Sequence, residues 1–268
     1  MDELKGKVAV ITGGAGVLCT AIAEGLAREG VKIALLDINK EKAEKALDLV
    51  RSAGSEGLAV KTSVLSREEL EQAAEKILST LGRVDILING AGGNSPKATT
   101  GSDQSFFDLP EDGARFVFDL NFMGTFLASQ AFGKVMADQK EGVILNIASM
   151  NAIRPLTRIP AYSAAKAAVA NFTQWLAVHM AQEYSPRIRV NAIAPGFFLT
   201  VQNRFLLKDD NDELTPRGRQ IIDHTPTGRF GTPEDLIGTV NWLLSEAAEF
   251  VTGIIVPIDG GFSAYSGV

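Results

Sequence analysis

The sequence predicts an α/β protein with a doubly wound parallel sheet of about seven strands and helices on both faces. Two observations favour this fold class. Short β-rich runs alternate with longer helical segments along the whole chain, which is typical of a parallel sheet with right-handed crossovers. Most of the short runs are also continuously apolar rather than alternating, as strands are when helices cover both faces of the sheet.

Each expected strand is rich in aliphatic and β-branched residues. The strands are expected at residues 7–12, 31–36, 58–62, 84–88, 143–148, 188–193 and 254–258. The helices are expected at residues 17–28, 40–51, 67–80, 112–138, 162–183 and 233–245. The last helix has a clear start signal, because Thr232 can act as N-cap and Pro233 occupies the first helical position before two acidic residues.

Two long connections interrupt this alternation, and we call them the first substrate loop (residues 92–111) and the second substrate loop (residues 197–231). Both are rich in turn-forming and polar residues. Each follows the carboxyl end of a strand, where open α/β sheets bind their ligands, and loops of this length are usually lids or binding loops. The chain shows no repeat and no linker. We therefore expect residues 1–268 to form one domain.

Composition and charge exclude several classes of function. Apolar residues make up 46% of the chain, and 26 basic against 32 acidic residues give a net charge of −6 without a basic cluster for nucleic acid. The start MDELKGKVAV does not resemble a secretory signal, and no apolar run is long enough to span a membrane. The single cysteine, Cys19, cannot form an internal disulfide. We expect a soluble, cytoplasmic protein.

A glycine-rich turn joins the first strand to the first helix. Gly13, Gly14 and Gly16 would let the backbone approach a pyrophosphate at the N-terminus of that helix, although a plain turn would have the same composition. Asp37 follows the second strand, where a carboxylate can bind both hydroxyls of an adenosine ribose and repel a 2′-phosphate. Asp37 alone would also suit a helix cap. Together the two features predict dinucleotide binding, with NAD favoured over NADP.

Tyr162 and Lys166 lie four residues apart and therefore share one face of a predicted helix. A lysine ammonium, together with the positive ring of an oxidised nicotinamide, would lower the pKa of the phenol from its usual value of about 10. Such a tyrosine can act as acid or base at a carbonyl. A tyrosine and a lysine at this spacing can also be two residues on a helix surface without a catalytic role. Ser149, which closes the preceding strand, favours the catalytic interpretation because its hydroxyl could donate to the substrate oxygen.

These residues resemble those of the short-chain dehydrogenase/reductase family, and the similarity covers nearly the whole chain. Residues 12–19 match the family's TGxxxGxG loop, residues 89–92 its NNAG segment, and Pro195–Gly196 with Thr200 the segment beside the nicotinamide carboxamide. The resemblance implies a Rossmann-type fold, an NAD-dependent oxidoreductase and a homo-oligomer, with a tetramer favoured. The small residues on several faces of the Tyr162 helix also suit a subunit partner.

The resemblance implies a role for each member of the site. Tyr162 is expected to be the general acid/base, Ser149 to orient the carbonyl, and Lys166 to hold the ribose and lower the pKa of Tyr162. Asn121 is expected to anchor a relay water with Lys166. The expected cofactor-binding residues are Gly13, Gly14, Gly16, Val17, Leu18, Asp37, Ser63, Val64, Asn89, Ala91, Gly92, Tyr162, Lys166, Pro195, Gly196, Phe198 and Thr200.

The chain departs from the family pattern at four positions. Val17 and Cys19 replace the second and third glycines of the loop, and a β-branched Val17 excludes left-handed backbone there. Ser63 stands where an aspartate near the adenine is usual, which weakens that contact. Gly90 replaces the second asparagine of the NNAG segment. These departures put the detailed geometry of the phosphate loop in doubt more than they put NAD binding in doubt.

The substrate is the least determined part of the prediction. Several segments resemble a subgroup described as fructuronate reductase or D-mannonate oxidoreductase, which interconverts a keto sugar acid and its aldonic acid. Arg154 and Arg158 lie between Ser149 and Tyr162, where they could bind a carboxylate or stay solvated. Asn94 and Lys97 could meet sugar hydroxyls. The alternatives are a gluconate-type, sugar-alcohol or 3-oxoacyl thioester enzyme, or a non-catalytic NAD-binding scaffold. No metal motif is present.

Overall fold

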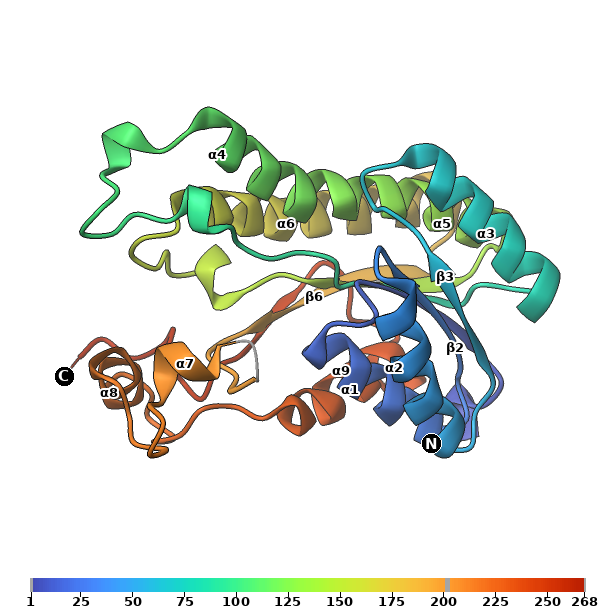
Figure 1. Cartoon of the computed structure of the whole chain (residues 1–268). Helices are drawn as coiled ribbons and strands as arrows, with labels where there is room; N and C mark the ends of the chain where they lie inside the picture. The colour runs from blue at the N-terminus through green and yellow to red at the C-terminus, as the bar shows by residue number, and fades with distance from the viewer. Residues whose placement is uncertain (1, 201–202, 268) are drawn as a thin grey trace.

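The sheet of this protein consists of seven parallel strands in the order β3-β2-β1-β4-β5-β6-β7, which confirms the predicted fold class. The computed structural model describes residues 2–200 and 203–267. The order reverses between β1 and β4, so this is the switch point of a doubly wound sheet (Figure 1). The strands are β1 (Val8–Thr12), β2 (Lys32–Asp37), β3 (Gly57–Lys61), β4 (Ile86–Asn89), β5 (Gly142–Ile147), β6 (Ile188–Pro195) and β7 (Ile255–Ile258).

Two hydrophobic cores lie on the two faces of the sheet, as Figure 1 shows by the helices above and below it. One core is formed with α1 (Val17–Arg28), α2 (Lys40–Ser52) and α9 (Ile237–Leu244). The other is formed with α3 (Arg67–Leu81), α5 (Gly124–Gln139) and α6 (Pro160–His179). Strands β1, β4 and β6 are buried at every position. The continuously apolar strands therefore do have both faces covered.

Three of the expected helices are interrupted or reshaped. The segment expected at 112–138 consists of α4 (Glu111–Phe118), a π-helical turn (Asp119–Met123) and α5. The helix expected at 162–183 begins earlier, at Pro160, and α6 passes into a second π-helical turn (Met180–Tyr184). The helix expected at 233–245 opens with a 3₁₀ turn (Pro233–Leu236) before α9, and Thr232 caps it as predicted. Apolar spacing reports a helical face but does not reveal a local change of helical pitch.

Both substrate loops contain short helices. Residues 92–111 include two 3₁₀ turns, Pro96–Ala98 and Phe106–Asp108. Residues 197–231 include α7 (Arg204–Leu207) and α8 (Pro216–Asp223), and residues 201–202 lie outside the described part of the chain. A small apolar cluster of Leu207, Ile221 and Phe230 holds this segment together. In Figure 1, α7 and α8 lie on the side toward which β6 runs, so they flank the carboxyl edge of the sheet.

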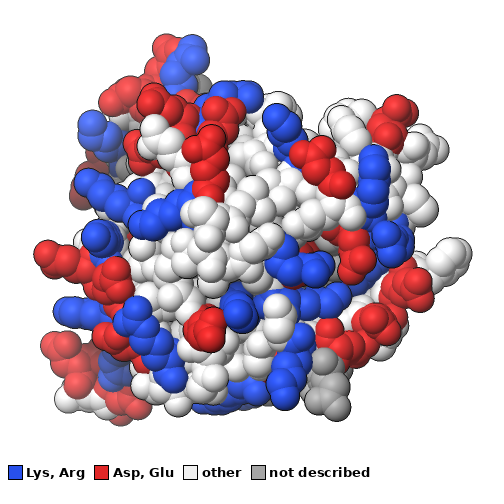
Figure 2. Space-filling model, turned by 90° about the vertical axis from the view of Figure 1, so that its right-hand side faces the viewer, with Lys and Arg blue, Asp and Glu red and all other residues white. Residues whose placement is uncertain are grey.

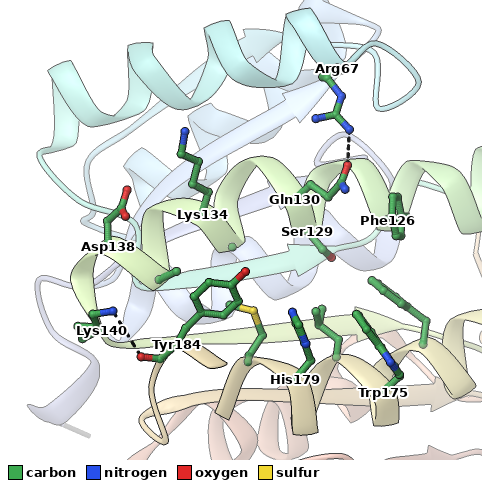
Figure 3. A pocket seen from close by; sticks show the side chains of 15 residues that line it. Arg67, Phe126, Ser129, Gln130, Lys134, Asp138, Lys140, Trp175, His179 and Tyr184 are labelled. Carbon is green, nitrogen blue, oxygen red and sulfur yellow. Dashed lines mark hydrogen bonds between the residues drawn. The ribbon is translucent and has the colours of Figure 1, made fainter. Parts of the chain in front are cut away.

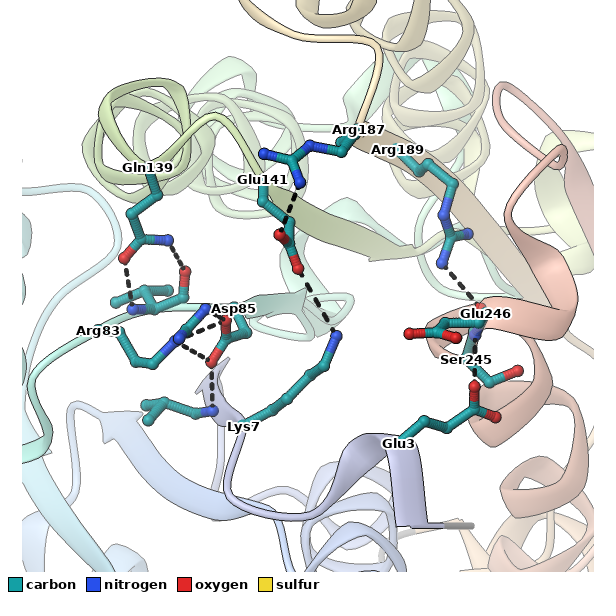
Figure 4. A network of polar contacts seen from close by, with 12 residues as sticks. Glu3, Lys7, Arg83, Asp85, Gln139, Glu141, Arg187, Arg189, Ser245 and Glu246 are labelled. Carbon is teal, nitrogen blue, oxygen red and sulfur yellow. Dashed lines mark hydrogen bonds and ion pairs between the residues drawn. The ribbon is translucent and has the colours of Figure 1, made fainter.

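The opposite, amino edge of the sheet is densely paired (Figure 4). The carboxylate of Asp85 is buried and accepts hydrogen bonds from the backbone of Val8 (2.8 Å) and from Arg83 Nε (2.8 Å). Arg189, also buried, donates to the carbonyls of Leu243 and Ser245. Figure 2 views the molecule from the side opposite α7 and α8, and basic and acidic side chains are interspersed over that face.

No helix in the described part of the chain is long and apolar enough to cross a membrane.

Candidate active site

The turn after β1 brings backbone against backbone at the switch point of the sheet. Gly13 has a φ of 62°, and a Cβ there would approach the Cα of Ala91 to 2.7 Å. A Cβ on Gly14 would approach Leu35 Cδ2 to 2.9 Å. Helix α1 then starts after Gly16 with no side-chain cap and no acidic residue in its first turn. Its first backbone N–H groups are therefore available to an anion, as a pyrophosphate site requires.

Val17 does not disturb this turn. It is the first residue of α1, and the right-handed helical conformation suits valine, so the expected conflict with a left-handed backbone does not arise. Val17 and Leu18 line the cleft beside Gly16.

Asp37 ends β2 beside the glycine turn. Its Oδ2 accepts from the backbone N of Ala15 at 3.1 Å, and its Oδ1 accepts from the backbone N of Asn39 at 2.9 Å. The cap of α2 is Asn39, which accepts from the N of Lys42, so capping is not the role of Asp37. Asp37 also lines a cavity of about 440 Å³ with Gly13 and Val64. The carboxylate is thus placed to meet a ribose.

The adenine end of this cavity is formed by the segment after β3. Thr62 and Val64 line it together with Ala91 and Gly92. Ser63 lies between them but is not among the lining residues, and its backbone N donates to Glu69 Oε2 at 2.8 Å. Ser63 therefore lies next to the expected adenine site without facing it.

Asn89 is buried beneath the site at the end of β4. Its Nδ2 donates to Asn146 Oδ1 at 2.8 Å and to Ser129 Oγ at 3.0 Å, and Asn146 in turn donates to Thr173 Oγ1 at 2.8 Å. These hydrogen bonds connect β4 to β5 and β5 to α6. Asn89 thus stabilises the central sheet below the cofactor rather than lining the cleft.

Two of the departures from the family pattern are coupled. A Cβ built on Gly90 would overlap the Sγ of Cys19 and approach the carbonyl of Thr12 to 2.9 Å. The thiol of Cys19 fills the space that a side chain at position 90 would need, and burial raises its pKa to about 12. Cys19 is therefore an inert packing group, and the glycine at position 90 accommodates it.

The catalytic candidates converge on a second cavity at the same edge. This cavity, of about 310 Å³, is lined by Ser149, Tyr162 and Lys166 and shares Gly16, Gly90 and Gly92 with the Asp37 cavity. Ser149 Oγ accepts from both the backbone N and the Nδ2 of Asn151, each at 3.2 Å. The hydroxyl proton of Ser149 is therefore left for donation, to the oxygen of Tyr162 in the free protein and to a substrate oxygen when one is bound.

Asn151 is a positioning residue that the sequence analysis missed. Its Oδ1 accepts from the Oγ of Ser163 and from the backbone N of Leu156, both at 3.0 Å. This buried amide thereby ties the loop of Ser149 to the first turns of α6, which carry Tyr162.

Lys166 and Asn121 meet around Gly92. Lys166 Nζ donates to the carbonyl of Ile147 at 2.7 Å and lies 5.6 Å from the centroid of the Tyr162 ring. Asn121 is in the π-helical turn, and its amide donates to Gly93 O and accepts from Gly93 N. A Cβ on Gly92 would meet Asn121 Oδ1 at 2.5 Å and Lys166 Nζ at 3.3 Å. The structure thus brings together the four residues expected to be catalytic.

Burial sets the protonation of this cluster. Desolvation raises the pKa of Tyr162, and its hydrogen bond with Ser149 lowers it by less. Lys166 donates to the carbonyl of Ile147, and burial lowers its own pKa to about 8; the expectation that Lys166 and an oxidised nicotinamide together lower the pKa of Tyr162 stays a prediction. Tyr162 is therefore protonated at neutral pH, the state that can donate a proton to an alkoxide.

The far wall of the catalytic cavity follows β6. Pro195, Gly196, Phe198 and Thr200 line it as predicted, and so does Asn203, which was not predicted. Asn203 accepts from the backbone N of Thr200 at 2.8 Å and donates to the carbonyl of Phe198 at 2.7 Å. It is thus the residue that shapes this segment.

The structure separates the four substrate candidates. Asn94 donates to Thr99 Oγ1 at 2.8 Å, and Lys97 is paired with Asp112 at 3.5 Å. Arg154 Nε donates to the carbonyl of Ser263. Arg158 is exposed, and its side chain has no ion pair or hydrogen bond with another described residue. Arg158 is therefore the candidate whose charge is uncommitted.

No group of three or more His, Cys, Asp or Glu side chains in the described ranges could hold a metal ion. The cradle formed by Gly13, Gly14 and Gly92, the open end of α1 and the carboxylate of Asp37 fit a dinucleotide instead. With an acid/base tyrosine at the other end of the cleft, the fold and the site define a nicotinamide-dependent oxidoreductase.

The chain belongs to the short-chain dehydrogenase/reductase family. Residues 14–263 match the family profile described as enoyl-(acyl carrier protein) reductase. Enzymes of this family act on hydroxyl and keto groups with NAD(H), and this chain is an NAD-dependent oxidoreductase of that family.

Relatives match over almost the whole chain. A Bacillus subtilis protein described as "Uncharacterized oxidoreductase UxuB" is 52% identical and covers 100% of this chain and 98% of its own length. The 5-keto-D-gluconate 5-reductase of Escherichia coli is 33% identical and covers 97% and 96%. A solved Haemophilus structure, titled as a "putative D-Mannonate oxidoreductase" with bound NAD, is 46% identical with a TM-score of 0.93 and covers 99% and 98%.

Proposed function

We propose that this enzyme transfers a hydride between NAD(H) and a keto or hydroxy sugar acid of the fructuronate/D-mannonate type. The observation that carries the proposal is the exposed guanidinium of Arg158, which has no acidic partner among the described residues and lies four residues before Tyr162, in the segment that joins Ser149 to α6. The resemblance to the Haemophilus structure described as a D-mannonate oxidoreductase supports it. The relative described as a 5-keto-D-gluconate 5-reductase also acts on a keto sugar acid.

Each residue of the site has a separate role in this reaction. The bound cofactor supplies or accepts the hydride. Ser149 donates a hydrogen bond to the substrate oxygen, because Asn151 already occupies its acceptor side. Tyr162 transfers the proton, and Lys166 holds a positive charge next to it. Asn121 fixes the backbone of Gly93, and with it the floor of the cleft between the two cavities.

A carboxylate on the substrate would pair with Arg158. Arginine binds carboxylates through two parallel hydrogen bonds, and this geometry fixes the orientation of a ligand as well as its charge. Arg154 is the weaker candidate, because its Nε is committed to Ser263. Asn94 and Lys97 are not required by this arrangement.

A second candidate function, a sugar-alcohol dehydrogenase, belongs to the same reaction class. A solved xylitol dehydrogenase with NAD⁺ is 31% identical with a TM-score of 0.85, and a sugar alcohol would need no arginine. A non-catalytic scaffold is disfavoured because Asn121, Ser149, Tyr162 and Lys166 are all present and assembled.

The test is a spectrophotometric panel of NADH oxidation with fructuronate, 5-keto-gluconate, a neutral ketose and a 3-oxoacyl thioester. We expect the highest kcat/KM with a keto sugar acid. A higher value with the neutral ketose or the thioester would refute the proposed substrate class.

We also propose that the chain assembles with copies of itself into a homotetramer. A cavity of about 550 Å³ lies away from the catalytic site between α5 and α6 (Figure 3). Phe126, Phe172 and Trp175 line it, and the Trp175 side chain is 56% exposed. Apolar surface of this kind suits a helical face that packs on a second copy. Light scattering of the protein and of Trp175→Glu tests this, with dissociation expected for the variant.

A further inference from the structure

A backbone N–H group fixes the orientation of the side-chain amide of Asn151. The N–H of Leu156 donates to Asn151 Oδ1 at 3.0 Å. A backbone N–H can only donate, so the amide atom that faces Leu156 must be the oxygen. The Nδ2 group therefore faces the other way, toward Ser149 Oγ at 3.2 Å. A flipped amide would place two donors against each other.

This orientation leaves the hydroxyl of Ser149 with one direction for its proton. Ser149 Oγ accepts from the backbone N and from the Nδ2 of Asn151, each at 3.2 Å, so both of its lone pairs are used. The proton must point to a third partner, which in the free protein is the oxygen of Tyr162. Ser149 is therefore confined to the role of donor on the side that faces the cleft.

The same amide also holds the helix that carries Tyr162. Asn151 Oδ1 accepts from Ser163 Oγ at 3.0 Å, and Ser163 directly follows Tyr162 in α6. Ser149, Asn151 and Ser163 are 7%, 6% and 8% exposed, so water competes little for these hydrogen bonds. Asn151 is not among the residues that line the catalytic cavity, whereas Ser149 and Tyr162 are. Any effect of Asn151 on a substrate must therefore pass through these two residues.

We propose that Asn151 acts in the reaction by making Ser149 an obligatory hydrogen-bond donor and by fixing its hydroxyl relative to Tyr162. The oxygen of a bound carbonyl gains negative charge as the hydride arrives at its carbon. A donor that is already oriented stabilises this charge without reorganisation. An unconstrained serine could instead turn its proton to another acceptor and present a lone pair to the substrate. This role does not depend on which carbonyl compound is the substrate.

The first experiment is Asn151→Asp, assayed with whichever compound of the substrate panel has the highest kcat/KM. An ionised carboxylate keeps the two hydrogen bonds that Oδ1 accepts, but it cannot donate to Ser149. The hydroxyl of Ser149 then donates to the carboxylate and turns away from the substrate. We expect kcat to fall about 10²-fold with little change in KM, as when an oxyanion donor is lost. The parent value of kcat in this variant would overturn the proposal.

The matched control is Asn191→Asp. Asn191 is a fully buried amide on β6 that donates to a backbone carbonyl at 2.9 Å and accepts from a backbone N–H at 3.2 Å, both in the segment before β7. It therefore resembles Asn151 in burial and bonding but is remote from Ser149. We expect a lower Tm for this variant and a kcat per folded molecule close to that of the parent. A loss of kcat equal to that of Asn151→Asp would assign both effects to stability and overturn the proposal.

A double-mutant cycle shows whether Asn151 acts through Ser149. Asn151→Ala removes the Nδ2 donor without adding a charge, and we expect kcat to fall about two- to ten-fold, as for the loss of one hydrogen bond. In the background of Ser149→Ala no hydroxyl remains to be oriented, so Asn151→Ala should lower kcat no further. Losses that multiply in the double variant would overturn the proposal.

The pH profile of alcohol oxidation is a readout that a purely structural role would not move. Oxidation requires the ionised form of Tyr162, and the hydrogen bond from Ser149 lowers the pKa of that tyrosine. Asn151→Ala should therefore move the rising limb of kcat to higher pH, whereas Asn191→Ala should leave it in place. A rising limb at the parent position in Asn151→Ala, with a loss of kcat that follows the loss of Tm, would overturn the proposal.

Discussion

The two edges of the sheet differ in how the cations nearest the strand ends are paired. At the amino edge, Asp85 pairs with Arg83, and Glu141 lies 3.9 Å from Lys7 and 3.6 Å from Arg187 (Figure 4). At the carboxyl edge, the exposed Arg158 has no acidic partner among the described residues, and Lys166 is buried against the carbonyl of Ile147.

This difference separates charges that stabilise the fold from charges that bind ligands. Lys166 is buried, and a buried cation without a counter-ion is destabilising in the free protein, so we expect its charge to serve catalysis; Arg158 is exposed and its charge stays available to an anionic ligand. Substitutions at the amino edge should therefore change stability, and substitutions at the carboxyl edge should change activity.

The largest effect is expected at the carboxyl edge, for Tyr162→Phe. The ring still packs but the proton donor is lost, so kcat should fall by about 10²–10⁴-fold, as is typical when a general acid is removed. Thermal melting and the fluorescence change on NADH binding should match those of the parent. Retained turnover would mean that another group carries the proton.

The corresponding change at the amino edge is Asp85→Asn. It removes the charge that Arg83 and the Val8 amide share, and because the carboxylate is buried we expect a loss of about 1–3 kcal/mol in the free energy of unfolding. Urea denaturation measures this loss, and kcat per folded molecule should stay unchanged. A drop in kcat without a drop in stability would contradict the division between the two edges.

Asp37→Ala tests the carboxylate that lines the cavity beside the glycine turn. The protein should prefer NADH over NADPH, and the variant should narrow that preference by about ten-fold or more, because a carboxylate near the 2′-phosphate repels it. Asp37→Asn separates the effect of the charge from that of the hydrogen bond, because asparagine keeps an acceptor for the Ala15 N–H but carries no charge. Equal use of both cofactors by the parent would rule out this role.

The smallest effect concerns pH. The pKa of Lys166 in the folded protein is about 8, below its usual value of 10.5. Between these values the unfolded chain binds the proton and the folded one does not, so the stability contributed at this site rises with pH. Loss of the charge beside Tyr162 should meanwhile lower kcat/KM for reduction above pH 8. The pH–rate profile of Lys166→Arg, which stays charged, should lack this decline.

The sequence predicted the architecture well because its signals are local. All seven strands are found within a few residues of their expected positions, since continuous apolar runs mark strands of a covered sheet. The π-helical turn that carries Asn121 was not predictable, because apolar spacing does not register one additional residue per turn. Helix α8 was predictable but missed: Thr215–Pro216 repeats the start signal that identified Thr232–Pro233.

The candidate site was predictable only where a motif has fixed spacing. The four residues expected to be catalytic were identified in this way, whereas Asn151 and Asn203 were not, because their contacts join segments that meet only in the fold. Arg158 was found as a charge, but its left-handed backbone could not be read from the sequence.

The contact between Cys19 and Gly90 also restricts how this protein can change over generations. A side chain at position 90 would collide with the thiol, so the replacement of Gly90 is blocked until position 19 has become smaller. The reverse order is open, because Cys19→Gly removes the thiol from the wall of the catalytic cavity at a cost of about 0.5–1 kcal/mol for a glycine within α1. We therefore expect position 19 to change before position 90 and not after it. A mutant library that varies one position at a time would miss the double replacement.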